Sequence, residues 1–453
     1  MRKVIALAWL LSCASVQAGL YDDPAFGSGG YVDVALGGTQ YLYDPPDLAV
    51  LPDRRIVAAT MLSTAVPHVP VLKVVRLMPD GGADPAFGVD GVATVPLSPL
   101  VVDWSYVTAL VPLVDGRLYV LGYTVRIENP PGGSGPVHDQ RTYLARLRSD
   151  GSIDPAFNGG SPWNGDDLMS HASVLPQDDG LLIVGPGFSC CTLGSGLQAR
   201  RFRLDGTPDP AFGIGGLLSI PASGSDTVGA MPVAGGGFQV LHHKPWAHGQ
   251  PARNFWRRYR ADGSVDMAYG GGGEQQIPLT ESFGMTQLHA LGDGTQLGVR
   301  GSCPMRWFDA EGRVLAVYTD CTSTGSANFR VQRYGEKWLF SGEQRFGGVP
   351  PPSDGTYLHV TDRAGRVDAA FAAPQGLRWR PPDAPTASYA VAADGDAHIV
   401  IARGTDSGIR VRRYRDLRGS DPLAEPVPAL QSFTAALLCL CLLLLAGRRL
   451  RPA

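Results

Sequence analysis

The sequence predicts an all-β fold, a seven-bladed β-propeller of four-stranded blades, together with an N-terminal signal peptide and a single C-terminal transmembrane helix. Three observations predict the propeller. A motif recurs at intervals along the chain, each interval contains alternating apolar runs joined by tight turns, and the chain ends carry complementary halves of the motif. Repeats of roughly 50 to 60 residues with four strands each are typical of propeller blades.

The composition agrees with a turn-rich β protein. The chain has 453 residues, of which 58 are glycine and 37 proline, and only 18% are charged. Its 44% of apolar residues are enough to bury a core, which excludes a disordered chain. The net charge of -3 gives no reason to expect nucleic acid as a partner.

Residues 1–18 are predicted to be a secretory signal peptide. Arg2 and Lys3 precede an apolar run, and small residues follow up to Ala18, after which we expect cleavage. A second interpretation stays open, because the stretch LLSC resembles a bacterial lipoprotein box with Cys13 as the lipidated residue. In either case the rest of the chain would be exported.

The repeated motif reads RLMPDGGADPAFGVDG in its first complete copy. Further clear copies and then degenerate ones follow, and these copies begin at Arg76, Arg146, Arg201, Arg258, Arg306, Val360 and Arg413. The glycines that they share lie at positions 81, 151, 206, 263, 312, 365 and 419. This near-regular spacing predicts one structural unit per copy.

The two chain ends hold one motif between them. The stretch YDDPAFGSGG at residues 21–30 is a second half without a first half, and RVRRYRDLRG at residues 410–419 is a first half without a second. The two halves would form one whole motif if the chain closed on itself. Closure would give seven motifs on a ring and would protect the sheet edges.

Each unit also contains a predicted β-hairpin. Apolar runs of alternating character flank Asp-Gly or similar turns at Gly116, Gly180, Gly294 and Gly395. The runs before each hairpin and before each motif add two more strands. Four strands per unit follow from this count.

The motif, the apolar strand after it and the hairpin turn together resemble the delta-60 repeat, a bacterial propeller repeat of uncharacterised function. The resemblance covers residues 20–421, within a propeller domain expected at residues 19–421, and it fades in the last three units. It implies a propeller fold and supplies no catalytic residues.

The motif itself offers a choice between chemistry and architecture. Asp150 and Asp154 could be calcium ligands, but calcium loops need several oxygens at alternating positions, and this motif has one Asp at each end of a turn. A site is also rarely needed once per blade. We therefore predict that Asp154 caps local amides or pairs with Arg146, and that Phe157 packs between blades.

Deviations from the repeat are better candidates for a binding site. The stretch LHHKPWAHGQ places His242, His243, Trp246 and His248 in one predicted loop, which we interpret as a solvated or partner-binding loop because no carboxylate or thiolate accompanies the histidines. Two insertions, at residues 125–142 and 344–357, are rich in proline and glycine and are predicted to be surface loops over one face.

Four cysteines fall in the exported part. Cys303 and Cys321 are the predicted disulfide, whereas adjacent Cys190 and Cys191 could form a vicinal bridge or remain separate thiols. No C-x-x-C spacing occurs, and we predict neither a metal nor a cofactor.

The C-terminal part is divided into a linker at 422–432, a transmembrane helix at 433–446 and a basic cytoplasmic tail at 447–453. The order of a Pro-containing stretch, a short apolar run and a basic tail resembles the PEP-CTERM sorting signals, especially their Ile-Pro-Thr-Leu variant. The corresponding residues here are Val427, Pro428, Ala429 and Leu430. The resemblance implies an inner-membrane anchor that a protease can remove.

These observations favour an exported, envelope-associated, monomeric propeller that acts as a non-catalytic binding or structural module. Its expected partner is an envelope or extracellular protein or polysaccharide. No nucleophile elbow, metalloprotease motif or P-loop occurs in the sequence. The alternative is a propeller hydrolase or lyase that acts on a polysaccharide or peptide with dispersed residues at the mouth of the channel, which converging carboxylates, histidines and arginines would favour.

Overall fold

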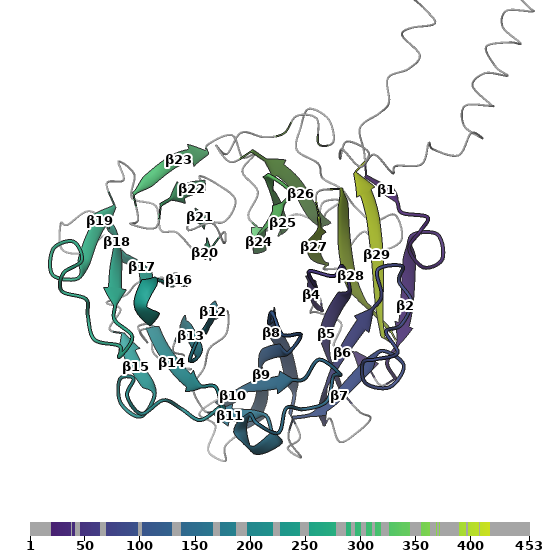
Figure 1. Cartoon of the computed structure of the whole chain (residues 1–453), viewed down its shortest axis with the longest axis horizontal. Helices are drawn as coiled ribbons and strands as arrows, with labels where there is room; N and C mark the ends of the chain where they lie inside the picture. The colour runs from purple at the N-terminus through teal and green to yellow at the C-terminus, as the bar shows by residue number, and fades with distance from the viewer. Residues whose placement is uncertain are drawn as a thin grey trace, which may run out of the picture.

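The computed structural model shows a ring of β-sheets (Figure 1). The structure describes residues 20–37, 39–40, 46–63, 69–97, 102–128, 137–165, 173–186, 197–220, 227–244, 253–277, 287–290, 295–299, 305–309, 313–318, 326–344, 355–362, 368, 371, 389–395, 397–406 and 408–416. The predicted signal peptide, linker, transmembrane helix and tail lie outside these residues.

Antiparallel pairing groups the strands into separate sheets, numbered here in chain order. Blade 1 contains β3 (Thr39–Gln40), β4 (Asp47–Val50), β5 (Ile56–Ser63), β6 (Pro70–Leu77) and β7 (Val92–Pro96). Blade 2 contains β8 (Trp104–Pro112), β9 (Leu118–Glu128), β10 (Val137–Leu147) and β11 (Trp163–Gly165). Blade 3 contains β12 (Ser173–Gln177), β13 (Gly180–Pro186), β14 (Leu197–Arg203) and β15 (Leu217–Ile220).

The remaining sheets continue round the ring. Blade 4 contains β16 (Thr227–Pro232), β17 (Phe238–Lys244), β18 (Arg253–Tyr259) and β19 (Glu274–Ile277), and blade 5 contains β20 (Gln287–Ala290), β21 (Gln296–Val299), β22 (Met305–Phe308) and β23 (Val314–Tyr318). A three-stranded sheet follows, with β24 (Ser326–Tyr334), β25 (Lys337–Gln344) and β26 (Gly355–Thr361). The closing blade contains β27 (Ala390–Asp394), β28 (His398–Thr405), β29 (Gly408–Asp416), β1 (Leu20–Asp22) and β2 (Tyr31–Ala35). Two 3-10 turns, η1 (Asn158–Gly160) and η2 (Ala234–Gly236), complete the described elements.

The predicted all-β propeller is confirmed, but its details need correction. Six sheets have four or five strands and make full blades, whereas β24, β25 and β26 form a sheet of only three strands among the described residues. The expectation of seven four-stranded blades is therefore wrong. This sheet carries the degenerate sixth motif, in which Val360 stands where the clear copies have an arginine that pairs with the motif aspartate. In the part of the chain described above, no helix has the length and apolar character needed to cross a membrane, so the described fold does not include the predicted transmembrane helix.

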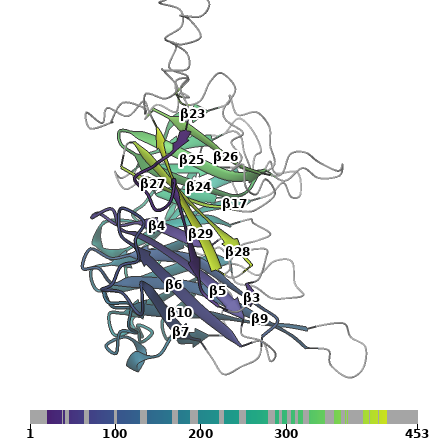
Figure 2. The ribbon, with the colours of Figure 1, turned by 90° about the vertical axis from the view of Figure 1, so that its right-hand side faces the viewer.

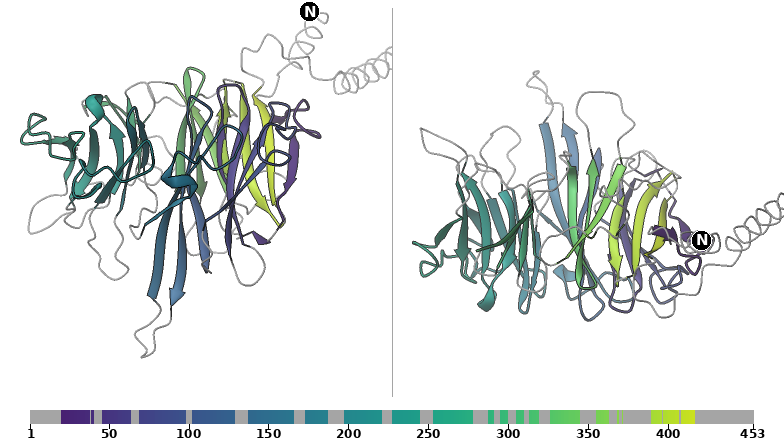
Figure 3. Two further views of the ribbon diagram at one scale, coloured as in Figure 1. Left: turned by 60° about the horizontal axis from the view of Figure 1, so that its bottom comes forward. Right: turned by 90° about the horizontal axis from the view of Figure 1, so that it is seen from above.

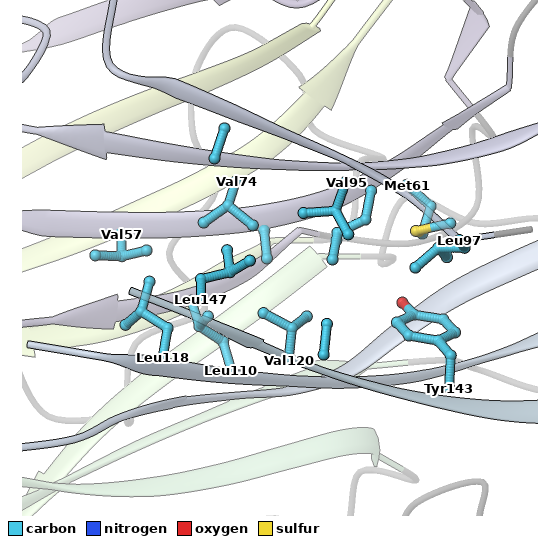
Figure 4. Close-up of a cluster of buried hydrophobic side chains, with 14 of the residues drawn as sticks. Val57, Met61, Val74, Val95, Leu97, Leu110, Leu118, Val120, Tyr143 and Leu147 are labelled. Atoms are coloured by element: carbon cyan, nitrogen blue, oxygen red, sulfur yellow. The ribbon is translucent and has the colours of Figure 1, made fainter. Parts of the chain in front are cut away.

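The hydrophobic core lies between the sheets. The innermost strands contact one another round the ring, for example β27 with β4, β4 with β8, and β16 with β20. One cluster joins blades 1 and 2, and its members include Val57, Val74 and Val95 of blade 1 and Leu110, Leu118 and Val120 of blade 2 (Figure 4). Alternating burial along β7 shows the same arrangement, because every second side chain points into this cluster.

The chain closes on itself in the closing blade. Both β1 and β2 pair with β29, with Leu20 opposite Asp416 and Tyr31 opposite Arg412. Figure 2 shows the yellow strands β28 and β29 next to the purple strands of the chain's first described residues. The prediction that the two half motifs meet in space is confirmed.

Candidate functional site

The repeated motif forms a buried arginine–aspartate ion pair in several of its joints. Arg146 Nε donates to Asp154 Oδ2 at 2.7 Å, and both side chains are buried. The backbone N–H of Ala156 donates to Asp154 Oδ1 at 3.0 Å. Burial alone would raise the pKa of the Asp154 carboxyl, but this N–H and the Arg146 guanidinium hold it below its usual value. The arginine–aspartate pairs at Arg76–Asp84 and Arg413–Asp23 have the same 2.7 Å distance.

The same motif also contacts the next blade. Arg146 Nη1 donates to the carbonyl of Leu204 at 2.5 Å, and the N–H of Asn158 donates to the carbonyl of Asp205 at 2.6 Å. The ring of Phe157 is fully buried, with the Arg146 guanidinium 4.8 Å from its centroid. Phe157 therefore packs between blades as predicted, and Asp154 both caps an amide and pairs with Arg146 as predicted.

Glycine is needed where two blades meet. Gly206 has a φ of +80°, and a Cβ at this position would lie 2.8 Å from both the Asn158 nitrogen and the Phe157 ring. Gly159 also has a positive φ, +64°, but a Cβ there would meet nothing within 4 Å. At Gly206, the glycine of the Asp-Gly turn, both the positive φ and the close approach of the preceding blade exclude a side chain. The sequence stretch 150–160 is an architectural joint.

The closing joint contains a larger set of ionisable groups, which we call the closure cluster: Asp23, Arg54, Asp394, His398 and Arg413. Arg54 comes from the turn between β4 and β5 of blade 1 and donates to both oxygens of Asp394, at 2.9 and 3.1 Å. His398 Nε2 lies 3.6 Å from Asp23 Oδ2, and Arg413 Nη1 lies 3.7 Å from Asp394 Oδ2. Burial and the cationic charge of Arg413 lower the pKa of His398.

The hairpins between second and third strands end at the face opposite the motifs, which we call the hairpin face. The longest is formed by β9 and β10, which pair from Leu118 with Leu147 out to Glu128 with Val137. It extends well beyond the other described strands (Figure 3). The predicted surface loop at residues 125–142 is thus wrong at both flanks, because residues 125–128 and 137–142 continue the two strands.

The structure places only part of the predicted binding loop. His242 and His243 are the fifth and sixth residues of β17, opposite Phe255 and Asn254 of β18. Trp246 and His248 lie outside the described residues. The second insertion begins in β25 and ends in β26, with its middle outside the described residues. These flanking strand ends lie at the hairpin face, but they belong to two different sheets of the ring.

The predicted disulfide of Cys303 and Cys321 stays a prediction, because both residues lie outside the described part, as do Cys190 and Cys191. Among the described residues, no group of three histidine, cysteine or acidic side chains could hold a metal ion.

Sequence reasoning missed a set of polar links between innermost strands. Asp47 Oδ2 of β4 accepts the N–H of Leu110 in β8 at 2.6 Å, and Ser173 of β12 accepts the N–H of Ala230 in β16 at 3.2 Å. Gln332 of β24 accepts the N–H of Ala393 in β27 at 2.9 Å. These residues share no common sequence pattern, so nothing in the repeat indicated them. They fasten neighbouring blades near the axis of the ring.

Comparison with known proteins supports the fold. The family model described as a domain of unknown function (DUF5122) beta-propeller matches residues 137–157, which hold β10 and the motif of blade 2. No curated protein matches the chain.

Several solved structures are similar at low identity. The β-propeller domain of the trilobed protease from Pyrococcus furiosus is 10% identical, with a TM-score of 0.42, and the match covers 86% of this chain and 100% of that one. Puromycin hydrolase is 13% identical with a TM-score of 0.41, and the match covers 82% of this chain but only 61% of the hydrolase. The C-terminal WD40 domain of Sif2 is 10% identical with a TM-score of 0.39, and the match covers 84% of this chain and 99% of that one. The short family match and the ring of sheets make this chain a β-propeller repeat protein.

Proposed function

We propose that the protein is an exported, non-catalytic binding module of the delta-60 repeat type that holds its ligand at the hairpin face. The observation that carries this proposal is the difference between the two faces of the ring. One face carries the same buried joint in blades 1 and 2 and in the closing blade, whereas the other carries hairpins of unequal length, with β9 and β10 the longest among the described residues. Variable segments on a rigid scaffold are the usual location of binding residues.

The scaffold favours binding because its joints and inner links fix each blade against the next. A ligand therefore meets hairpins whose bases are held by contacts with neighbouring blades, which lowers the ordering cost of association. Among the described innermost strands, the acidic side chains of Asp47 and Asp394 are both engaged, the first by backbone N–H groups and the second by Arg54. This arrangement supports a binding role over a hydrolytic one. The ligand class we propose is an envelope or extracellular protein or polysaccharide.

Shortening the long hairpin tests the proposal. Replacing residues 127–138 by Asn-Gly leaves Arg126 opposite Asp139 as the last strand pair and should keep the fold, because β8 pairs with β9 only as far as Val125. We expect binding to a solubilised envelope protein fraction or to purified envelope polysaccharide to fall by about tenfold or more, the usual cost of removing an interface hot spot.

The matched control for this variant changes the opposite face. Val89 is 77% exposed in the motif of blade 1, and Val89→Ser should leave the same binding unchanged. Equal binding by both variants and the parent protein would contradict a role for the hairpin. Turnover of a polysaccharide or peptide substrate by the parent protein would contradict the non-catalytic role itself.

Export is a separate part of the proposal. It rests on the cationic residues Arg2 and Lys3, the apolar run after them and Ala18, while residues 427–430 and the basic residues after them are proposed to sort the protein within the envelope. Cells expressing the protein with an internal tag and a C-terminal tag should yield the internal tag outside the cytoplasm. Recovery of both tags in the cytosolic fraction would refute export.

A further inference from the structure

We infer that the closure cluster is an acid-sensitive latch, in which a proton on the imidazole of His398 weakens the contact between the closing blade and blade 1. This inference concerns the stability of the ring and goes beyond the proposed binding function. It rests on the position of His398 in the repeat and on the contacts of its two ring nitrogens.

His398 occupies a position that three other joints fill with a permanent cation, whereas Gly180 and Gly237 occupy it in blades 3 and 4. Strand register places Val57, Tyr119 and Val400 opposite the motif arginines 76, 146 and 413. Two residues before each of these lie Arg55, Arg117 and His398, respectively. Arg55 and Arg117 reach the motif aspartates Asp84 and Asp154 at 2.9 and 3.7 Å, and His398 reaches Asp23 at 3.6 Å.

The three-stranded sheet follows the same rule. Leu339 of β25 lies opposite Val360, the first residue of the sixth motif, and Lys337 lies two residues before it. The Nζ of Lys337 lies 2.7 Å from Asp368 Oδ2. The described joints that use this position therefore pair the motif aspartate with arginine or lysine, except the closing joint. Only there is the group one that titrates near neutral pH.

The second nitrogen of His398 faces a cation. Arg54 Nη2 lies 3.2 Å from His398 Nδ1. A guanidinium can only donate, so Nδ1 must accept, and the ring must be neutral with its proton on Nε2 towards Asp23. Protonation of Nδ1 removes this hydrogen bond and places two cations in contact. Because Arg54 belongs to blade 1 and His398 to the closing blade, the repulsion acts across the joint.

The charged groups around the His398 imidazole have opposite effects on its pKa, and their balance sets the direction of the shift. Asp23 and Asp394 favour the proton, whereas burial, Arg413 and Arg54 disfavour it, and the net effect lowers the pKa of His398 below 6.5. A histidine whose pKa is lowered in the folded state stabilises the fold fully above its unfolded pKa. That contribution is lost as the pH falls through the folded value. The latch is therefore closed at neutral pH and weakened in mild acid.

Urea unfolding at pH 7.5 and pH 5.0 tests the latch in the full chain. We expect the folding equilibrium constant of the parent protein to fall by about tenfold or more on acidification, the effect of losing one hydrogen bond to a charged group. His398→Gln retains an acceptor that cannot titrate, so it should lose most of this pH dependence while folding normally at pH 7.5. Arg54→Gln removes the facing cation and should also reduce the pH dependence.

A local measurement separates the latch from a general acid effect. Hydrogen exchange of β1, β2 and the turn before β5 should accelerate at pH 5.0 beyond the intrinsic rate change in the parent protein and not in His398→Gln. An identical pH dependence of stability in the parent protein and His398→Gln would overturn the inference. Faster exchange spread evenly over blades 2 to 4 would overturn it as well.

Discussion

Replacing Arg413 by methionine is expected to lower the free energy of unfolding by about 3 to 5 kcal/mol, the usual cost of leaving one member of a buried ion pair without its partner. Arg413 Nε donates to Asp23 Oδ2 at 2.7 Å, and the side chains of the two residues are 7% and 3% exposed. Its Nη1 donates to the carbonyl of Pro79 in the adjoining blade, and its guanidinium lies 4.8 Å from the centroid of the Phe26 ring.

The effect should be large because the Arg413–Asp23 pair lies buried in the joint where the first described strands meet the last one. Strands β1 and β2 reach the fold through β29, which carries Arg413. Losing the ion pair therefore weakens the pairing of β1 and β2 with β29, which closes the ring. Chemical denaturation at pH 7.5, followed by tryptophan fluorescence, measures the change.

A matched control is an exposed arginine–acid pair in the same molecule. Arg333 Nη2 lies 3.2 Å from Glu336, and both side chains are more than half exposed, so Arg333→Met should cost less than about 1 kcal/mol. Pairing Arg413→Met with Asp23→Asn should recover part of the loss, because asparagine is neutral and can still accept the N–H of Ala25. Equal midpoints for Arg413→Met and Arg333→Met would contradict a structural role for the closing pair.

The sequence predicts the joints well because repetition amplifies a weak signal. One copy of the motif could be a calcium loop, but an arginine eight residues before an aspartate in several copies indicates a contact that each blade needs. Arg76 and Asp84, and Arg146 and Asp154, form that contact at 2.7 Å. The split motif predicts the pairing of β1 and β2 with β29 for the same reason.

Other features depend on contacts that no local pattern encodes. Arg54 and His398 are 344 residues apart, and their contact exists only because the ring brings the first described blade against the last. The hairpin of β9 and β10 was misjudged because prolines and glycines near residue 130 indicate a loop, whereas alternating residues on both sides extend the strands. The repeat predicts four strands for every unit, whereas β24, β25 and β26 form a sheet of three among the described residues. The motif of this unit has lost its arginine, but that change alone does not indicate the number of strands.

Replacing Phe157 by alanine is the second change for which we expect a large effect, about 3 to 5 kcal/mol of destabilisation. Phe157 is 1% exposed and belongs to a cluster that joins Tyr119 and Leu144 of blade 2 to Leu181 and Phe202 of blade 3. Removing the ring would leave a cavity between two rigid sheets. Gly206 of the next turn has no side chain with which to fill it.

The conservative variant separates packing from the mere presence of an aromatic ring. Phe157→Leu keeps most of the volume and should cost less than about 1.5 kcal/mol. Ile214→Ala, at a side chain that is 90% exposed in the motif of blade 3, should stay within about 0.5 kcal/mol of the parent protein. The dependence of the unfolding free energy on urea concentration gives a further distinction. An unchanged slope for Phe157→Ala means that the ring still unfolds as one unit, whereas a smaller slope means that blades 2 and 3 separate before the rest, which would contradict joints that couple the whole ring.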